Sequence, residues 1–284
     1  MKINSETASD RDSDRCFHGF HLHLSVDWSK LEAHEYDLNF KREVTEEEEC
    51  KIKQLCECRL ARMPVQYIIK EWDFRDLRLT MTPPVFIPRP ETEQLVELVL
   101  EKATPDSTIL EIGCGSGAIC LSLLKALPQT RVTAVDQSKL ACELTKKNAE
   151  QNNLADNLKV VQSKLQDDGT LSQPVDLDDP VDIIVSNPPY VPYAQLMDLE
   201  PEIKLYEDLR ALEAGKDGLR VVKSLLTLAS TTLRPGGLLF LEVDASHPTL
   251  IEQWITKHPQ LNMQFVKSYK DFCEKDRFVE LKKV

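Results

Sequence analysis

The tetrapeptide Asn187-Pro188-Pro189-Tyr190 could do chemistry because it directly follows a short apolar run. That run, residues 182–186, predicts a buried strand, which must end at the prolines because they have no N–H to give to a ladder. Asn187 then lies at the carboxyl end of a strand, where open α/β sheets bind ligands. An amide oxygen beside a donor-free backbone offers acceptors that suit an incoming NH2 group. An ordinary Asn-Pro turn is the alternative.

A glycine loop, Gly113-Cys114-Gly115-Ser116-Gly117, comes after a predicted strand at 108–112 and before a predicted helix at 118–127. Glycines without side chains let a ligand approach the backbone. Asp136 ends the next predicted strand, where it can accept hydrogen bonds from two ribose hydroxyls, as an acidic residue about 20 residues beyond the loop does in dinucleotide folds. We therefore expect a nucleoside cofactor. The spacing also satisfies the dinucleotide pattern, and Glu111 before the loop could simply bind backbone donors.

The Asn-Pro-Pro-Tyr motif indicates which of these cofactors is bound. It argues against a dinucleotide, because a dehydrogenase has no evident use for it. An enzyme that methylates an amide or amino nitrogen from S-adenosylmethionine does. An amide nitrogen is a poor nucleophile, and two acceptors, the Asn187 side-chain oxygen and the Pro188 carbonyl, would fix it in line with the methyl group. The Tyr190 ring could cover the planar group.

The elements that position these residues alternate between strand and helix after residue 91, which predicts a mostly parallel, doubly wound sheet covered by helices on both faces. The predicted strands are 108–112, 131–136, 159–161, 182–186, 238–243, 263–269 and 277–281, and the predicted helices are 91–103, 118–127, 138–152, 218–233 and 248–257. A turn is predicted at 234–237. The strand ends carry the candidate residues.

The preceding part of the chain predicts a smaller unit. Thr45 followed by four glutamates is typical of a helix start, and residues 63–68 should end the helical part. Residues 72–81 predict a β-hairpin, and four prolines between 83 and 90 make a stiff extended connector. We expect four parts: a poorly ordered segment at 1–27, a short helical domain at 28–69, a hairpin and connector at 70–90, and the αβ domain at 91–284.

Composition limits the classes of partner. The 284 residues have a formal net charge of −12, which argues against a protein that binds nucleic acid through many phosphate contacts. No apolar stretch approaches the roughly 20 residues that span a bilayer. The eight cysteines show neither a CxxC pair nor a metal-finger spacing, so reduced cysteines and no metal site are expected.

Further motifs extend this picture to a family. From about Arg59 to Val279 the chain resembles the HemK/PrmC family, the N5-glutamine methyltransferases of peptide-chain release factors. The motifs that carry the resemblance are Asn187-Pro188-Pro189-Tyr190, the glycine loop, Pro64-Val65-Gln66-Tyr67-Ile68, Ile87-Pro88-Arg89-Pro90-Glu91-Thr92-Glu93, Ala211-Leu212-x-x-Gly215-x-Asp217-Gly218 and Lys270-Asp271-Phe272.

The resemblance implies a class I, Rossmann-like methyltransferase domain with a seven-stranded sheet, and a helical N-terminal domain that helps to hold the release factor. The reaction would be methylation of the glutamine in a Gly-Gly-Gln loop. Residues implied to bind S-adenosylmethionine are Glu111, Gly113, Cys114, Gly115, Ser116, Gly117, Asp136, Leu165 and Asn187. Those implied to hold the glutamine and catalyse its methylation are Asn187, Pro188, Pro189 and Tyr190.

Four residues depart from the family pattern. Lys70 and Glu274 stand where glycines are usual, Pro84 replaces the glycine of a Pro-Gly pair, and Leu165 replaces an aromatic residue. The helical domain is also shorter than the family's. The sequences of residues 240–244 and 271–273 resemble the animal mitochondrial members more than the bacterial ones, so a mitochondrial location is expected. The cytoplasm is the alternative, because no import signal is visible.

Two rival functions stay open. An adenine-N6 methyltransferase acting on DNA or RNA would use the same motif on an exocyclic amine, after extruding the base. The acidic balance and the lack of an evident basic module disfavour it. The other rival is a cofactor-binding interaction module without activity.

Overall fold

A computed structural model describes residues 44–177 and 180–284. The chain divides into two compact units, residues 1–70 and 71–284. The predicted disorder of residues 1–27 lies outside the described residues. No helix among the described residues is long and apolar enough to cross a bilayer.

Two helices make up the described part of the first unit: α3 (Glu46–Leu60) and α4 (Val65–Ile69). The predicted helix start at Thr45 is confirmed. The Thr45 hydroxyl accepts a hydrogen bond from the Glu48 amide, and the Glu48 carboxylate accepts one from the Thr45 amide, which makes a capping box. The helical part ends in the segment predicted to end it, but that segment itself forms a helix that the sequence did not predict. Helix α4 begins directly after Pro64, where a helix tolerates proline because its first amides have no partner within the helix.

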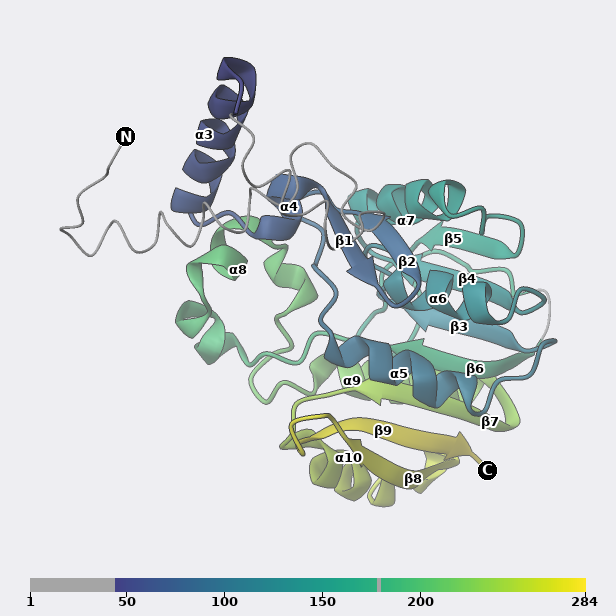
Figure 1. Ribbon diagram of the computed structural model, residues 1–284. Helices are drawn as coiled ribbons and strands as arrows, with labels where there is room; N and C mark the ends of the chain where they lie inside the picture. Colours follow the sequence, from purple (N-terminus) through teal and green to yellow (C-terminus); the bar gives the residue numbers. More distant parts are fainter. Residues whose placement is uncertain (1–43, 178–179) are drawn as a thin grey trace. The chain divides into compact units, whose positions relative to one another are not determined.

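The second unit is built on a seven-stranded sheet with the strand order β5-β4-β3-β6-β7-β9-β8 (Figure 1). Every neighbouring pair is parallel except the two pairs made by β9, which runs antiparallel to β7 and β8. The mostly parallel sheet is therefore confirmed. Its strands are β3 (Thr108–Ile112), β4 (Arg131–Asp136), β5 (Leu158–Gln162), β6 (Val181–Ser186), β7 (Leu233–Glu242), β8 (Met263–Lys270) and β9 (Asp276–Lys283).

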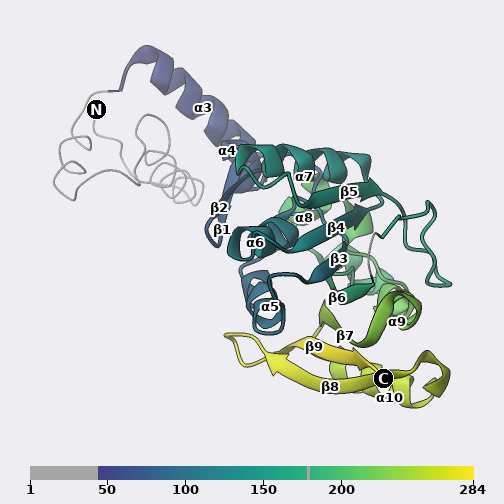
Figure 2. The same cartoon turned by 90° about the vertical axis from the view of Figure 1, so that its right-hand side faces the viewer.

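Helices cover both faces of this sheet, as Figure 2 shows from its edge. On one face lie α5 (Glu91–Leu100), α6 (Ala118–Ala126) and α7 (Lys139–Gln151), and on the other lie α9 (Arg220–Thr232) and α10 (His247–Thr256). All five residues of β3 are buried, as expected for a parallel strand covered on both faces. The carboxyl ends of β3, β4 and β6 consequently meet at one edge of a rigid core.

Short elements complete the second unit. The hairpin of β1 (Glu71–Phe74) and β2 (Leu77–Thr80) is confirmed, and its second strand contacts α6 and α7. The segment after β6 holds η2 (Tyr193–Asp198), α8 (Pro201–Tyr206) and η3 (Leu209–Ala211), and η4 (Pro259–Leu261) precedes β8. Sequence patterns did not predict any of these four short helices.

The predicted turn at 234–237 is part of β7. Leu233 pairs with Val181 and Leu238 with Ile183, so the residues between them form an irregularity in a strand that then continues. The strand begins earlier than predicted because Leu233 already pairs with Val181 before the bulge.

The structure explains two departures from the family pattern. Lys70 has φ of 64° and Glu274 has φ of 60°, both in the left-handed region that favours glycine. The usual glycines at these positions would adopt this backbone without strain. In this chain the backbone of Lys70 and of Glu274 adopts the same left-handed conformation although both residues carry a side chain.

Candidate active site

A cavity of about 560 Å³ opens at the carboxyl ends of β3, β4 and β6. This volume lies within the range of roughly 300–1,000 Å³ that is typical of small-molecule sites. The cavity brings together these residues predicted to bind cofactor or substrate: Gly113, Gly115, Asp136, Leu165, Asn187, Pro188, Pro189 and Tyr190. Its position agrees with the rule that ligands bind outside the carboxyl ends of the strands.

Backbone geometry shapes the glycine loop. Gly113, Gly115 and Gly117 all have positive φ, at 84°, 55° and 86°. A Cβ at Gly117 would lie 3.0 Å from the Leu121 side chain, whereas a Cβ at Gly115 would meet nothing within 4 Å. Gly115 is therefore favoured by its φ and by its place in the cavity wall, and Gly117 also by close packing against α6.

Asp136 ties the end of β4 to this loop. One carboxylate oxygen accepts from the Gly115 amide at 3.0 Å, and the other accepts from the Ser138 amide at 2.8 Å. Burial raises the pKa of the Asp136 carboxyl, and the two amides oppose that shift. A carboxylate has about four acceptor sites. Two therefore stay available, one on each oxygen, which fits a pair of neighbouring ribose hydroxyls.

Glu111 has a structural partner within the same region. Its buried carboxylate accepts from the Cys120 amide at 3.1 Å, in the first turn of α6, where an acceptor satisfies one of the helix's free amides. Burial raises the pKa of Glu111 to about 8. Glu111, Cys114 and Ser116 line a second, smaller cavity beside the loop, not the large one. Their contact with a cofactor stays a prediction.

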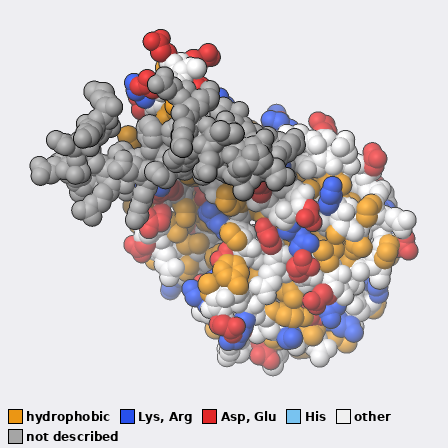
Figure 3. Space-filling view, in the orientation of Figure 1, with side chains coloured by type: hydrophobic (Ala, Val, Ile, Leu, Met, Phe, Trp, Pro, Cys, Tyr) orange, Lys and Arg blue, Asp and Glu red, His pale blue; other side chains and the backbone are white. Residues whose placement is uncertain are grey.

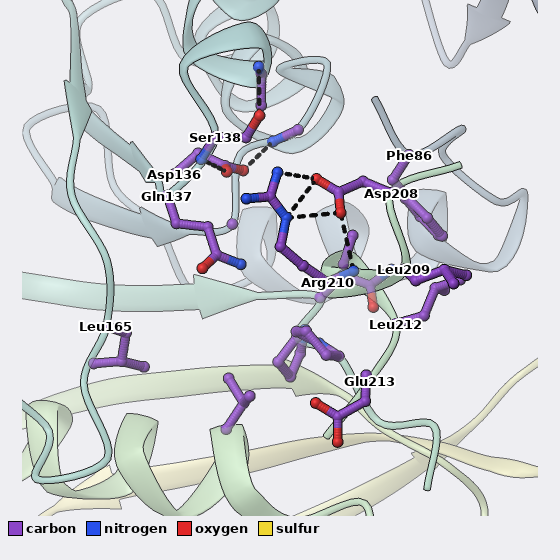
Figure 4. A pocket seen from close by; sticks show the side chains of 18 of the residues that line it. Phe86, Asp136, Gln137, Ser138, Leu165, Asp208, Leu209, Arg210, Leu212 and Glu213 are labelled. Atoms are coloured by element: carbon purple, nitrogen blue, oxygen red, sulfur yellow. Dashed lines mark hydrogen bonds and ion pairs between the residues drawn. The ribbon is translucent and has the colours of Figure 1, made fainter. Parts of the chain in front are cut away.

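An aspartate–arginine pair that the sequence reasoning missed lines the same cavity, where both of its side chains act electrostatically on Asp136 (Figure 4). Arg210 donates to both carboxylate oxygens of Asp208, at 2.6 Å from Nη2 and 2.9 Å from Nε. The Asp208 amide donates to the Pro84 carbonyl at 2.8 Å. Leu165 lies at the opposite side of the same space. The neighbouring family motif at Ala211-Leu212 was the signal that could have drawn attention to this pair.

A partly buried ion pair holds this segment against the proline-rich connector. Glu207 accepts from Arg89 Nη2 at 2.7 Å and from the Ile87 amide at 3.3 Å. Its side chain is 1% exposed, so both bonds compensate for its burial. Arg89 belongs to the Ile-Pro-Arg-Pro-Glu-Thr-Glu motif, and this contact gives that arginine a structural role next to the cavity.

Asn187 is held by residues from two distant elements. Its Nδ2 donates to Thr92 Oγ1 at 3.1 Å, and the Thr92 hydroxyl donates to Glu242 Oε2 at 2.8 Å. Thr92 lies in α5 and Glu242 at the end of β7, and both are buried. Burial raises the pKa of Glu242 to about 7. Sequence reasoning did not single out either residue for the site.

The rest of the tetrapeptide continues the cavity wall. Pro188, Pro189 and Tyr190 line it, and the prolines leave their backbone without donors there. Burial raises the pKa of Tyr190 to about 12, so its hydroxyl is neutral at physiological pH. Gly218 packs so closely that a Cβ there would lie 2.5 Å from the Tyr190 carbonyl oxygen. This contact explains the glycine of the Gly215-x-Asp217-Gly218 motif.

No cluster of three or more histidine, cysteine or acidic side chains that could hold a metal ion occurs within residues 44–177 and 180–284. The seven cysteines described there are all free.

Comparisons with known proteins place this chain in a family. Residues 90–199 match the family description "Methyltransferase small domain", and residues 25–69 match "PrmC N-terminal domain". The human protein named MTRF1L release factor glutamine methyltransferase is 45% identical over 242 residues, which cover 82% of this chain and 71% of the relative. A release factor glutamine methyltransferase from Lactococcus lactis is 36% identical over 247 residues, covering 86% and 87%.

A solved structure supports the fold. A methyltransferase from Pyrococcus furiosus aligns with a TM-score of 0.52 at 20% sequence identity, covering 84% of this chain and 98% of that one. Together with the seven-stranded sheet, this likeness shows a class I, Rossmann-like methyltransferase fold. The sequence relatives go further than the fold, and by them the chain belongs to the family of release factor glutamine methyltransferases.

Proposed function

We propose that this enzyme transfers a methyl group from S-adenosylmethionine to the side-chain nitrogen of the glutamine in the Gly-Gly-Gln loop of a peptide-chain release factor. The observation that carries the proposal is the shared cavity. A nucleoside-binding edge at Asp136 and a donor-free acceptor edge at Asn187–Tyr190 face the same space. The family relatives support the release factor as the substrate.

For the cofactor, the residues present fit S-adenosylmethionine. Asp136 keeps two acceptor sites for the ribose hydroxyls, and Gly113 and Gly115 leave the cavity wall without side chains. Leu165 adds an apolar surface, and the predicted cofactor contacts of Glu111, Cys114, Ser116 and Gly117 belong to the same proposal. When bound there, S-adenosylmethionine supplies an electrophilic methyl group.

On the substrate side, the Asn187 Oδ1 and the Pro188 carbonyl each accept one N–H of the glutamine amide. Tyr190 covers the planar amide. These contacts hold the nitrogen in one orientation, and positioning of this kind contributes several kcal/mol to catalysis. The new N–C bond would form as the methyl C–S bond of the sulfonium breaks and leaves a neutral thioether, and the N–H proton would leave to water at the cavity mouth. The neutral Tyr190 hydroxyl is not required as a base.

The surface beside the cavity suits a protein substrate. Tyr193, which lines the cavity, is 71% exposed, and Met197 and Leu205 in the same segment are 77% and 66% exposed. Apolar side chains of this size favour contact with a protein. Where the second unit is visible in Figure 3, acidic and basic side chains alternate instead of forming a broad basic area that would attract a nucleic acid.

The two units would share the work. We assign docking of the release factor to residues 28–69 and the chemistry to residues 91–284, with the hairpin and connector at 70–90 between them in the sequence. Deletion of residues 1–69 should raise the KM for the release factor much more than the KM for S-adenosylmethionine. An equal change in both constants would contradict this division.

For location, we propose the mitochondrion, with the cytoplasm as the alternative, because residues 240–244 and 271–273 resemble the animal mitochondrial members of the family more than the bacterial ones. Fractionation of cells that express the full-length natural protein decides between them. Enrichment in the cytosol would refute the mitochondrial proposal.

The proposed reaction has a direct test. The enzyme is incubated with S-adenosylmethionine and a release factor, and the loop peptide is analysed by mass spectrometry. The mass of one added methylene unit on the glutamine is expected. A Gln→Asn release factor is the control, because its nitrogen falls short of the methyl group by about one C–C bond, roughly 1.5 Å. Methylated adenine in a parallel reaction with DNA or RNA, without a modified release factor, would support the rival nucleic-acid activity.

A further inference from the structure

A buried chain of hydrogen bonds ends at Asn187. It begins at Glu242, passes through the Thr92 hydroxyl and reaches the Asn187 side chain, with donor–acceptor distances of 2.8 and 3.1 Å. Thr92 is 2% exposed and Glu242 is 1% exposed. Water therefore cannot replace either partner easily, and each bond depends on the next.

The chain has a direction. A threonine hydroxyl has one hydrogen, and here Thr92 donates it to the Glu242 carboxylate. Thr92 can then only accept from Asn187, so the atom of Asn187 that faces it must be the nitrogen. The amide of Asn187 also approaches Glu242 and stabilises its charged form. Both contacts require an N–H on that side of the amide, and the oxygen consequently lies on the other side.

We infer that Glu242, acting through Thr92, is a positioning residue that keeps the Asn187 oxygen turned toward the substrate nitrogen. The inference rests on the proposed function, in which that oxygen accepts a substrate N–H. A side-chain amide rotated by half a turn would present N–H groups to the N–H groups of the substrate. Such an amide would repel the nitrogen that it should orient.

The protonation state of Glu242 determines whether the Asn187 amide keeps this orientation. Its charged neighbours are Glu91 in α5 and Arg277 in β9, with Tyr190 nearby after β6. Burial raises the pKa of Glu242 to about 7, with Arg277 acting in the opposite direction and Glu91 adding to the rise. A protonated Glu242 donates to Thr92. The Thr92 hydrogen is then free to bind the Asn187 oxygen, and the amide rotates.

Lowering the pH should slow methyl transfer. Glu242 is charged above its pKa, and the Asn187 oxygen then faces the substrate. As the pH falls below about 7, the rate of the chemical step should fall, approaching tenfold for each pH unit on the acidic limb. The affinity for the release factor should change less, because the rest of the docking surface does not depend on this amide.

The first test compares Thr92→Val with Thr92→Ser. Valine preserves the shape but removes the hydroxyl, and we expect about a tenfold loss of single-turnover rate, the effect of one hydrogen bond. Serine restores the hydroxyl and should restore most of the rate. Thr130→Val is the matched control, because Thr130 is equally buried but donates to the Pro105 carbonyl, away from the cavity. Thermal unfolding of each variant verifies that it is folded.

The second test is the pH profile of Glu242→Gln. Between pH 6 and 8 the wild-type single-turnover rate should rise through the Glu242 limb, and the variant's rate should lack that limb. If Glu242→Gln does not fold, Thr92→Val measured at pH 6 and pH 8 replaces it. This variant has no hydroxyl relay, so its rate should change less with pH than the rate of wild type.

The outcomes separate the inference from the proposed function. A wild-type enzyme that does not methylate the release factor refutes the proposed function. A wild-type enzyme that methylates it, with Thr92→Val as fast as Thr92→Ser, overturns the positioning role. So does a Glu242→Gln profile that superimposes on that of wild type.

Discussion

The two sides of the cavity are constructed in different ways. On the cofactor side, the glycine loop and Asp136 are joined by bonds to backbone amides, and the partners of Asp136 are 21 and 2 residues away in sequence. On the substrate side, Asn187 is joined to Thr92 across 95 residues, and Thr92 to Glu242 across 150. The cofactor side therefore depends on local backbone conformation, and the substrate side depends on the assembled sheet.

The largest expected effect is on the substrate side. Asn187→Ala removes the acceptor that orients the substrate nitrogen, so the single-turnover rate should fall about 10²-fold or more, as when one positioned polar group is deleted from an active site. Stopped-flow or quench-flow kinetics at saturating S-adenosylmethionine measures it. A loss smaller than threefold would mean that the Asn187 side chain does not position the amide.

The next effect belongs to the cofactor side. Asp136→Ala should weaken S-adenosylmethionine binding by about 1–3 kcal/mol, because two ribose hydroxyls and two backbone amides lose their acceptor. Calorimetry measures the affinity, and Asp136→Asn, which keeps one oxygen, should lose less. Asn187 is also expected to line the cofactor site, so Asn187→Ala should weaken this affinity too, but by less than Asp136→Ala. Equal losses in both variants would break the distinction between the two sides.

A smaller effect tests the role of backbone conformation. Gly115→Ala introduces a Cβ at φ of 55° without any neighbour within 4 Å, so the cost in unfolding free energy should be only about 1 kcal/mol, the strain of the left-handed region. Chemical denaturation measures it. A much larger loss would show that Gly115 is constrained by packing in addition to its φ.

The smallest effect comes from removing left-handed backbone strain instead of adding it. Glu274→Gly relieves the left-handed strain at φ of 60°, although glycine also increases the entropy of the unfolded chain. A net stabilisation of a few tenths of a kcal/mol is expected in chemical denaturation. A clear destabilisation would indicate that the Glu274 side chain contributes contacts of its own. The rate of methyl transfer should stay as in wild type, because Glu274 lies outside the cavity lining.

Local patterns were sufficient to predict most of the sheet and the cofactor side. The strand 108–112, the glycine loop and Asp136 follow one another closely, so a short window of sequence contains the whole arrangement. The capping box at Thr45 is local in the same sense. In each case the physical determinant, a β-branched run, a φ requirement or an N-cap, acts within a few residues.

The remaining features depend on tertiary contacts. Thr92 looks like an ordinary first-turn residue of a helix, and Glu242 ends an apolar strand without any local sign of its partner. The Asp208–Arg210 pair lies in a segment whose short helices lack strong periodicity. The bulge at 234–237 is defined only by its pairing with β6. No local window contains the residue that each of these side chains or strands meets.

The position of β9 has a consequence for folding during synthesis. β9 follows β8 in sequence but lies between β7 and β8 in the sheet. When β7 leaves the ribosome, one of its edges stays unpaired until β9 emerges. Leu239, Phe240 and Leu241, which are fully buried in the folded protein, cannot complete their burial before then. An unpaired apolar edge of this kind is a site for aggregation. Premature termination just before residue 276 should therefore yield an aggregation-prone chain that depends on chaperones. Every residue that lines the cavity would already be present in that chain.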